Sequence, residues 1–401
     1  MKILHVNFSD SEGGAAIAVK RFHDILNINS LNSYMMVSEK KYNQNNIINI
    51  PKNSEKIKNL FKDSFNRKII KLLKQNNTGS HSLNLIPSKL LKKINNFNAD
   101  VVNLHWIGNE TISIKNINKI KSEVIWTLHD MWPFCGTEHY SLTEEYIQGY
   151  KSVNKQNSLL SFNIDKYIWN LKKKNFGNIN KIICTSEWMY KKVIKSGIFK
   201  NKKITTIPLL IDQNFWRPIN KILAKEILSI NKNKKVIVFG ADNFIANKRK
   251  GFKLFVESIK KLEEIDFKIL TFGENKNLDD LKKLNIENLG YIQDDLTKKI
   301  VYSAADVTVV PSTIEAFGLV AQEATHCGSP CVVFKDTGLT SVIENKKNGY
   351  LANYKSSESL AEGIKWCLNN MNSKQDEINK FTKEKFNTGN IIESYINFLK
   401  S

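Results

Sequence analysis

Two glutamates, Glu315 and Glu323, stand eight residues apart in a sequence of 401 residues, a spacing that lets both serve one ligand. They lie in residues 306–334, DVTVVPSTIEAFGLVAQEATHCGSPCVVF. Between them Gly318 stands where the chain should enter a helix, whose first backbone N–H groups lack helical partners and bind phosphate well. Carboxylates on both sides of such a turn suit a ligand with a sugar, a pyrophosphate and a ribose. In the simpler interpretation, Glu315 stabilises the helix dipole and Glu323 is a solvated charge.

Apolar runs flank this turn on both sides. Val307 to Val310 and Cys331 to Phe334 are short and rich in β-branched residues, which predicts strands buried on both faces. Between them we expect a helix from near Phe317 to about Cys327, because Gly328 favours the left-handed position that ends a helix. The segment therefore predicts a strand, a ligand loop, a helix and a second strand.

A pair of basic residues, Arg249 and Lys250, lies in a second loop of the same kind. It belongs to residues 240–252, GADNFIANKRKGF, which follow a predicted strand and precede a predicted helix. Cations at this position can neutralise the charge that builds on a departing diphosphate. Without the flanking strand and helix, a pair of solvated charges would be the simpler interpretation in a chain with 60 basic residues.

His129 and Asp130 directly follow another predicted strand, Val124 to Leu128. Open α/β sheets bind their ligands at the carboxyl ends of the strands. A lone histidine is more often a hydrogen-bonded structural group, but His129 combines this position with a neighbouring carboxylate. We therefore expect it to belong to the site.

The first strand, Lys2 to Phe8, runs into a turn that contains Gly13 and Gly14 and then into a helix from about Ala15. The turn falls short of G-x-G-x-x-G, which disfavours a dinucleotide site and hydride transfer. From the pattern alone, tight packing between the strand and the helix explains the two glycines.

Two domains are expected, because 401 residues exceed what one hydrophobic core usually serves. Strand and helix patterns alternate through both halves, which favours an α/β protein with two doubly wound sheets. Residues 207–218, IPLLIDQNFWRP, carry two prolines and an aspartate and mark a boundary. We expect domains over residues 1–212 and 213–385, followed by a C-terminal helix within residues 386–401.

The formal charge of +21 attracts nucleic acid, anionic lipid and phosphorylated substrates alike, and so identifies no partner. Residues 52–74 predict a basic amphipathic helix, which suits either an anionic membrane surface or core packing with one solvated face. The five scattered cysteines favour reduced thiols in a cytosol. With no visible signal peptide and no apolar run near the ~18 residues that span a bilayer, we expect a cytoplasmic protein.

The residues around the two glutamates resemble the E-x7-E signature of retaining glycosyltransferases with the GT-B fold, and most of all glycosyltransferase family 4. The matching residues are Ser312, Glu315, Phe317, Gly318, Glu323, Gly328 and Pro330. The resemblance implies a GT-B fold, with two Rossmann-like domains facing a central cleft. It also implies an enzyme that moves a sugar from a nucleotide-sugar donor to an acceptor, with the C-terminal helix returning to the first domain.

The resemblance assigns roles around the donor. Glu315 would contact the donor sugar, Glu323 would hold the ribose hydroxyls, and Lys250 matches the lysine that binds the donor phosphates. Many family members also carry an arginine where this chain has Ala241, and Arg249 is the nearest substitute. The backbone amides that would hold the diphosphate are those of Phe317, Gly318, Leu319 and Val320.

Further roles follow for residues at other strand ends. The string TLHDMWPF resembles a subset of family 4 enzymes of bacterial surface-polysaccharide assembly, in which the histidine matching His129 faces the donor sugar. Gly13 and Gly14 become candidates for contacts with the acceptor in the cleft. Gly290 and Tyr291 would line the pocket of the nucleotide base, although Tyr291 could equally pack.

The same subset often carries several cysteines after TLHDMWPF, whereas Cys135 stands alone here. A metal-held loop is therefore not expected. Residues 140–176 are polar and aromatic with little strand pattern, and we expect a helical, partly mobile insertion near the acceptor.

We therefore expect a retaining glycosyltransferase that transfers a sugar from the nucleotide-sugar donor to a saccharide or lipid-linked acceptor. It would need no cofactor and would bind no nucleic acid. We expect it to act in the synthesis of bacterial surface polysaccharide. Its expected location is the cytoplasm, or alternatively the inner face of the plasma membrane. No D-x-D triplet ends a strand, and the cationic loop can replace a divalent ion, so we expect metal independence. Two rival interpretations are a sugar-nucleotide epimerase of the same fold and a basic nucleic-acid-binding protein.

Overall fold

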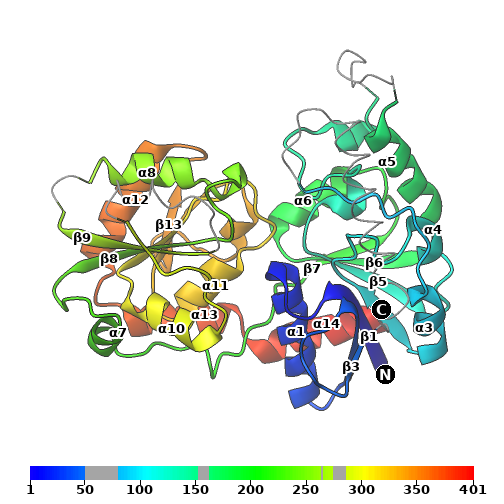
Figure 1. The fold of residues 1–401 in the computed structure, drawn as a ribbon, viewed down its shortest axis with the longest axis horizontal. Helices are drawn as coiled ribbons and strands as arrows, with labels where there is room; N and C mark the ends of the chain where they lie inside the picture. Colours follow the sequence, from blue (N-terminus) through cyan, green and yellow to red (C-terminus); the bar gives the residue numbers. More distant parts are fainter. Residues whose placement is uncertain (50–79, 152–161, 263–264, 274–285) are drawn as a thin grey trace. The chain divides into compact units, whose positions relative to one another are not determined.

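The computed structural model describes residues 1–49, 80–151, 162–262, 265–273 and 286–401. They divide into two compact units (Figure 1): residues 1–210 with 394–401, and residues 211–393. The boundaries expected from the sequence were at 212 and 385. The helix predicted over residues 52–74 lies outside the described residues.

The first unit is built on a seven-stranded sheet in the order β3-β2-β1-β4-β5-β6-β7, and every pairing between neighbouring strands is parallel. The strands β1, β4 and β5 are almost wholly buried, as their apolar composition predicts. The strands are β1 (Lys2–Ser9), β2 (Asn32–Glu39), β3 (Ile47–Asn49), β4 (Val101–Leu104), β5 (Glu123–Leu128), β6 (Ile179–Cys184) and β7 (Lys203–Thr206).

Helices connect these parallel strands. The connecting segments contain the α-helices α1 (Gly13–Ile28), α3 (Leu90–Phe97), α4 (Ile114–Ile117), α5 (Ile164–Asn175) and α6 (Glu187–Lys195), and the 3-10 helices η1 (Trp132–Phe134) and η2 (Glu145–Gln148). Helix α1 packs on β1 and β2, and α6 packs on β6 and β7. The helix expected from about Ala15 begins two residues earlier, at Gly13, which itself has a positive φ.

The expected C-terminal helix is present as α14 (Thr388–Lys400), and its last residues belong to the first unit. Asn103 Nδ2 donates a hydrogen bond of 3.1 Å to the hydroxyl of Tyr395. Lys181 Nζ donates one of 2.6 Å to the carbonyl of Leu399. These bonds tie the end of the chain to the strands β4 and β6.

The expected insertion over residues 140–176 contains the helices η2 and α5 where the structure describes it. Lys172 of α5 is fully buried, and its Nζ donates to the carbonyls of Trp132, Cys135 and Gly136, the last at 2.7 Å. This amine holds the segment that follows β5, so the described part of the insertion packs into the first unit.

The second unit has a six-stranded sheet in the order β10-β9-β8-β11-β12-β13, again with parallel pairings. Both strands predicted around the glutamates are present with the predicted bounds. The strands are β8 (Lys235–Gly240), β9 (Phe267–Phe272), β10 (Ile286–Asn288), β11 (Val307–Val310), β12 (Cys331–Phe334) and β13 (Gly349–Ala352).

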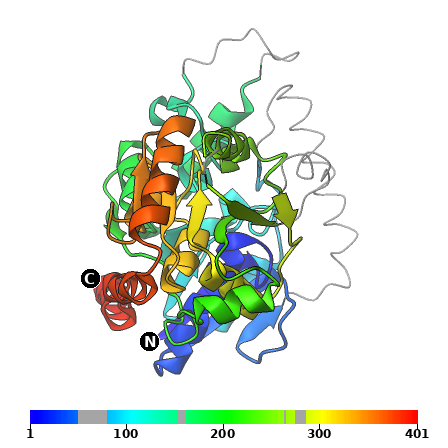
Figure 2. The same ribbon diagram turned by 90° about the vertical axis from the view of Figure 1, so that its left-hand side faces the viewer.

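Helices cover both faces of this second sheet (Figure 1). Helix α12, orange in Figure 2, packs on β12 and β13 and also against α8. On the other face α10 packs on α7 and α11, and α11 packs on α13. The helices are α7 (Lys221–Ile227), η4 (Lys248–Lys250), α8 (Phe252–Ile259), α10 (Asp295–Ala304), α11 (Leu319–His326), η5 (Gly338–Ser341), α12 (Ser357–Asn370) and α13 (Gln375–Lys385).

Each sheet has one place where the strand order changes direction: between β1 and β4 in the first unit, and between β8 and β11 in the second. Loops that leave such neighbouring strands run to opposite faces and leave room for a ligand at the carboxyl edge. The candidate residues Arg249 and Lys250 follow β8, and Glu315 follows β11. Strand order therefore directs the search for a site to these two loops.

Candidate functional site

In the second unit, the loops after β8 and β11 meet through three charged side chains. Lys250 Nζ lies 2.8 Å from Glu315 Oε2, and Arg249 Nη1 lies 3.3 Å from the same oxygen. The three side chains are between 14% and 21% exposed, so they are largely but not wholly removed from water. Residues that are 65 and 66 positions apart in the sequence thus form one cluster.

Backbone contacts fix the two loops against each other. The amide of Thr313 donates to the carbonyl of Arg249 at 2.8 Å, and Arg249 Nη1 donates to the carbonyl of Ile314 at 2.8 Å. Gly251 has φ +73°, and a Cβ added there would lie 2.0 Å from the carbonyl oxygen of Pro311. Only glycine permits this approach, so the K-G pair of the sequence has a structural reason.

The electrostatics of the cluster favour an ionised carboxylate. Burial alone would raise the pKa of Glu315, but the charges of Lys250 and Arg249, with hydrogen bonds from Lys250 and Ser312, outweigh it and lower the pKa from 4.5 to about 2. Burial, followed by the charge of Arg249, lowers the pKa of Lys250, while Glu315 opposes this change. Two cations facing one anion leave the cluster with an excess positive charge.

The helix that follows Glu315 begins at Leu319, two residues after the predicted start near Phe317. Gly318 precedes it with φ +110°, which glycine adopts without strain and which delays the first helical residue. The predicted end is confirmed, because Cys327 caps the helix and Gly328 has φ +77°. Phe317 is buried with its ring 6.0 Å from that of Phe386.

The first turn of α11 offers free backbone donors. Within the described part of the chain, no backbone hydrogen bond is donated by the amides of Gly318, Leu319 or Val320, and the helical bonds start with Gln322 to Gly318 at 3.1 Å. These three residues are half-buried. Such amides can bind an anion, and the helix dipole adds to the attraction.

Glu323 lies further along α11 and is 4% exposed. Its Oε2 accepts a hydrogen bond of 3.1 Å from the hydroxyl of Tyr302 on α10. Sequence reasoning missed Tyr302, because only the packing of α10 against α11 brings it to the carboxylate. The interpretation of Glu323 as a solvated charge is therefore wrong.

Gly290 and Tyr291 follow β10 at the same carboxyl edge. The amide of Gly273, at the end of β9, donates to the carbonyl of Gly290 at 2.8 Å. A Cβ added to Gly290 would meet nothing within 4 Å, and Tyr291 is 56% exposed. Their contact with a base stays a prediction. The role of Arg249 as a substitute for the arginine missing at Ala241 also stays a prediction. In this structure the Arg249 guanidinium contacts Glu315.

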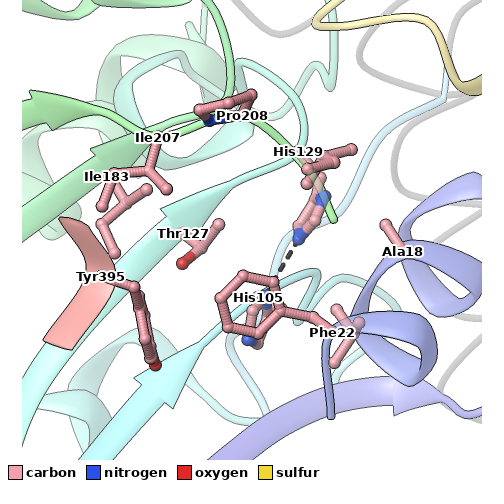
Figure 3. A pocket seen from close by; sticks show the side chains of 11 residues that line it. Ala18, Phe22, His105, Thr127, His129, Ile183, Ile207, Pro208 and Tyr395 are labelled. Atoms are coloured by element: carbon pink, nitrogen blue, oxygen red, sulfur yellow. Dashed lines mark hydrogen bonds between the residues drawn. The ribbon is translucent and has the colours of Figure 1, made fainter. Parts of the chain in front are cut away.

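In the first unit, His129 is one end of a row of three histidines. His129 Nε2 lies 2.9 Å from His105 Nδ1, and His105 Nε2 lies 2.9 Å from His5 Nδ1. His105 and His129 line a small cavity together with Phe22, Thr127 and Tyr395, among others (Figure 3). The sequence indicated His129, but it gave no reason to connect it with His105 or with His5, which looks like an ordinary residue of β1.

These three rings are neutral. Burial, with a contribution from His23, lowers the pKa of His5 to about 3. Burial lowers the pKa of His129 to about 4, although the charge of Asp130 opposes this. The pKa of His105 is lowered by burial and by its two histidine neighbours.

The carboxylate of Asp130 does not bond to His129, contrary to the reason for which we selected that histidine. Asp130 Oδ2 lies 2.6 Å from His139 Nδ1, and its Oδ1 accepts from the amide of Trp132 at 3.0 Å. His139 Nε2 in turn lies 2.8 Å from Ser82 Oγ. Ser82, His139 and Asp130 thus have the connectivity of a hydrolytic triad, but Ser82 is only 3% exposed and Asn109 donates to its Oγ. We interpret this group as structural.

Gly13 and Gly14 begin α1 and are exposed. A Cβ added to Gly13 would meet nothing within 4 Å. The interpretation of Gly13 as a residue of tight strand-to-helix packing is therefore wrong, and its contact with an acceptor stays a prediction.

The described part of the chain contains no group of three or more His, Cys, Asp or Glu residues that could hold a metal ion. None of its helices is long and apolar enough to cross a membrane. The five cysteines are buried thiols, and none of them forms a disulfide.

Comparison with known proteins gives three relevant findings. Residues 220–385 match the family described as "Glycosyl transferases group 1". The chain is 26% identical over 330 residues to a 41.2 kDa protein in the cps region of Klebsiella pneumoniae. This alignment covers 80% of this chain and 83% of that protein. The chain is 30% identical over 193 residues to an uncharacterized glycosyltransferase of Methanocaldococcus jannaschii, covering 45% of this chain and 48% of that protein.

A solved structure extends the likeness to the whole chain. Anabaena Alr3699/HepE, in complex with UDP and glucose, has a TM-score of 0.66 and 16% identity, covering 100% of this chain and 99% of that chain. Together with the two parallel sheets, this similarity shows the GT-B fold with two Rossmann-like domains, so the expected fold is confirmed.

The sequence relatives agree with the expected family. Residues 220–385 match the group 1 glycosyltransferases, and this match together with the relatives supports a place among the GT-B glycosyltransferases similar to family 4. These relatives favour neither the epimerase nor the nucleic-acid-binding protein that the sequence had left open.

Proposed function

We propose that this protein is a retaining glycosyltransferase that moves a sugar from a nucleotide-sugar donor to a saccharide or lipid-linked acceptor. The observation that carries the proposal is the cluster of Arg249, Lys250 and Glu315 beside the turn that leads into α11. It combines an excess of positive charge with unpaired backbone amides, at the place where the strand order of the second sheet changes direction.

The diphosphate of the donor would bind to the amides at the start of α11. Phosphate oxygens accept from helix N-terminal amides, and Lys250 and Arg249 add charge-assisted bonds. When the sugar leaves, negative charge grows on the diphosphate, and the two cations stabilise it in the transition state. The ion pairs with Glu315 hold both cations near the phosphate position before the donor binds.

The carboxylates would recognise the two ends of the donor. Glu315, kept ionised by its neighbours, accepts hydrogen bonds from hydroxyls of the transferred sugar. Glu323 accepts them from the ribose, with its orientation set by Tyr302. In the first unit, we propose that His129 contacts the transferred sugar.

We also propose that transfer is independent of metal ions. Arg249 and Lys250 can supply the counter-charge that a divalent ion would otherwise provide. Treatment with a chelator is expected to leave the rate unchanged, and a rate that is abolished by the chelator and restored by Mn²⁺ would refute this part of the proposal.

The first donor to test is a UDP-sugar, because the structurally similar Anabaena protein was solved with UDP and glucose. The cps-region relative supports a role in surface-polysaccharide synthesis. The cytoplasmic location stays a prediction. The contact of residues 52–74 with a membrane surface also stays a prediction, because those residues lie outside the described part of the chain.

Binding tests the proposal before any acceptor is known. Thermal shifts are measured for the purified protein with UDP, GDP, ADP and their common sugars, because a ligand at about 100 times its Kd should stabilise it by about 2.7 kcal/mol. One nucleotide should stabilise the protein, and Lys250→Ala and Glu323→Gln should weaken that effect. If no nucleotide raises the melting temperature, the proposed donor site is wrong.

The matched control is Lys248→Ala. Lys248 lies in the same short helix η4 as Lys250 but is exposed, so the substitution changes the net charge equally and leaves the cluster intact. If Lys248→Ala weakens binding as much as Lys250→Ala, only the overall charge matters and the proposed site is wrong. Once an acceptor is found, NMR of the product gives its anomeric configuration, and inversion would exclude the retaining mechanism.

A further inference from the structure

The row of His5, His105 and His129 does more than fill space around the cavity. Each of its two contacts joins a δ nitrogen of one ring to an ε nitrogen of the next, at 2.9 Å. His5 lies on β1, and the other two directly follow β4 and β5. The order of the strands in the sheet therefore places the three rings side by side.

The hydrogen bonds of neutral rings restrict one another. A neutral imidazole carries one N–H and one bare nitrogen, and each contact needs one of each. The N–H groups must then point the same way along the whole row. Only two arrangements satisfy both contacts: all three rings carry hydrogen on Nδ1, or all three carry it on Nε2.

The inner end of the row distinguishes the two arrangements. His5 is 0% exposed, and its Nε2 has no hydrogen-bond partner in the described part of the chain. With hydrogen on every Nε2, an N–H of His5 would be buried without an acceptor. With hydrogen on every Nδ1, His5 buries only a lone pair, and orphaned N–H groups are the rarer defect in proteins.

The outer end agrees with this choice. His129 is half-buried, and no hydrogen bond to its Nδ1 is present among the described residues. With hydrogen on every Nδ1, the one N–H that the row leaves unused belongs to this ring. There it can meet water or a ligand, which no group at the inner end can do.

The groups around the row do not reverse its direction. On α1, the ring of Phe22 lies 5.9 Å from that of His5, and His23 lies 6.4 Å away with its Nδ1 bonded to Ser33. Asp24 and Lys20 of the same helix pair with each other. Asp130 bonds to His139 and Trp132, and the hydroxyl of Tyr395 bonds to Asn103.

We propose that His5 and His105 are positioning residues that hold His129 as its Nδ1–H tautomer, with this N–H directed away from the row as a hydrogen-bond donor. Given the proposed function, the acceptor of this bond is a hydroxyl oxygen of the transferred sugar. His129 then orients the sugar as a neutral donor and does not remove a proton.

The row also explains how His129 stays neutral. A second proton on His129 would have to sit on Nε2, where it would face the Nδ1–H of His105. Two donors would then meet at 2.9 Å, so protonation requires the whole row to reverse or break. Burial, which lowers the pKa of each ring, acts in the same direction.

NMR of the full chain labelled with [15N]histidine tests the proposal without any substrate. Two-bond 1H–15N correlations separate Nδ1–H from Nε2–H rings, and the chain has seven histidines. His326 places its Nδ1 against an oxygen acceptor, the carbonyl of Gln322, whereas His139 Nδ1 lies 2.6 Å from Asp130 Oδ2 and 3.2 Å from the donor Nε1 of Trp106. With the row, at least four Nδ1–H rings are therefore expected, the three of the row and His326. Three or fewer would overturn the proposal.

Variants assign the signals and test the coupling. In His105→Phe, His129 loses the N–H that faces its Nε2, so we expect a mixture of its tautomers and a rise of its pKa toward the ordinary value of about 6.5. His5→Phe, a milder change at the far end, should give a mixture in both remaining rings. A His129 that stays Nδ1–H in both folded variants would show that the row does not set its tautomer.

The matched control is Tyr395→Phe, which changes another residue of the same cavity and leaves the row intact. Its histidine tautomers should equal those of the wild type. If they change as in His105→Phe, general loosening of the cavity explains the effect and the proposal fails. If instead the tautomers are as expected but no nucleotide sugar binds, the proposed function fails while the positioning role stands.

Discussion

The charged cluster of the second unit and the histidine row of the first unit use opposite means to hold polar side chains. Arg249, Lys250 and Glu315 are charged, partly exposed, and joined by contacts between ions. His5, His105 and His129 are neutral, the first two are buried, and directional hydrogen bonds join the three rings. Charge suits the binding of an anion such as a diphosphate, whereas fixed neutral donors suit a neutral ligand such as a sugar.

The comparison also teaches what each region should be sensitive to. An ion cluster responds to removal of a single charge and to pH, because its energy comes from Coulomb interaction. The row responds to loss of hydrogen-bond direction, and changes of pH near neutrality should leave it unaltered.

Gly251→Ala should have the largest effect, because the new Cβ would lie 2.0 Å from the carbonyl oxygen of Pro311 at a residue with φ +73°. Strain and overpacking together should lower the free energy of unfolding by about 4 kcal/mol. Denaturant unfolding measures the loss. The control is Gly13→Ala, which shares a positive φ of +83° but has open space around the added atom. Equal losses would mean that the contact with Pro311 is unimportant.

Low pH should weaken the second unit through Glu315. Its pKa is lowered from 4.5 to about 2, so its stabilising contribution is complete above pH 4.5 and is lost as the pH falls toward 2. The full contribution is about 3 kcal/mol, an upper value because the side chain is partly exposed. Unfolding free energies of the wild type and Glu315→Gln, measured across this range, should converge at the acid end. A constant difference would contradict the ionised cluster.

Lys250→Ala should lower turnover by roughly 10²-fold, about 2.7 kcal/mol, because it removes a cation from the departing diphosphate. Initial rates with saturating donor measure this loss. The exposed neighbour Lys248, replaced by alanine, should keep nearly the full rate. If Lys250→Ala lowers turnover only slightly, groups other than Lys250 stabilise the charge on the diphosphate.

Tyr395→Phe should have the smallest effect. It removes the hydroxyl that accepts from Asn103 Nδ2 at 3.1 Å and leaves the ring in place. A neutral buried hydrogen bond contributes about 1 kcal/mol, so the melting temperature should fall only slightly. A loss several times larger would mean that neutral hydrogen bonds in the first unit matter as much as the ion cluster does in the second.

Much of the second unit was predictable from local patterns. The β-branched runs gave β11 and β12 with their observed bounds, and Gly328 marked the end of α11. The start of α11 was placed two residues early, because Gly318 adopts a positive φ that postpones the first helical turn. Helix ends are set by such single backbone angles, which hydrophobic periodicity does not report.

The partners of side chains were much less predictable. His129 was selected for its neighbour Asp130, but the structure pairs Asp130 with His139 and pairs His129 with His105. Tyr302 reaches Glu323 from another helix. Adjacent residues at a strand end point in different directions, so closeness in sequence is a poor guide to contact there.

Local patterns in the chain predict the fold class, since alternating apolar strands and helices favour two doubly wound sheets. The residues around the glutamate pair and Lys250 add a resemblance to glycosyltransferases. These features depend on local spacing, which the chain carries directly. Only the tertiary structure decided that Lys250 meets Glu315 and that His5 supports His105 and His129. The physical reason is that parallel strands are joined by long crossovers, so strand order brings together residues that no local pattern connects.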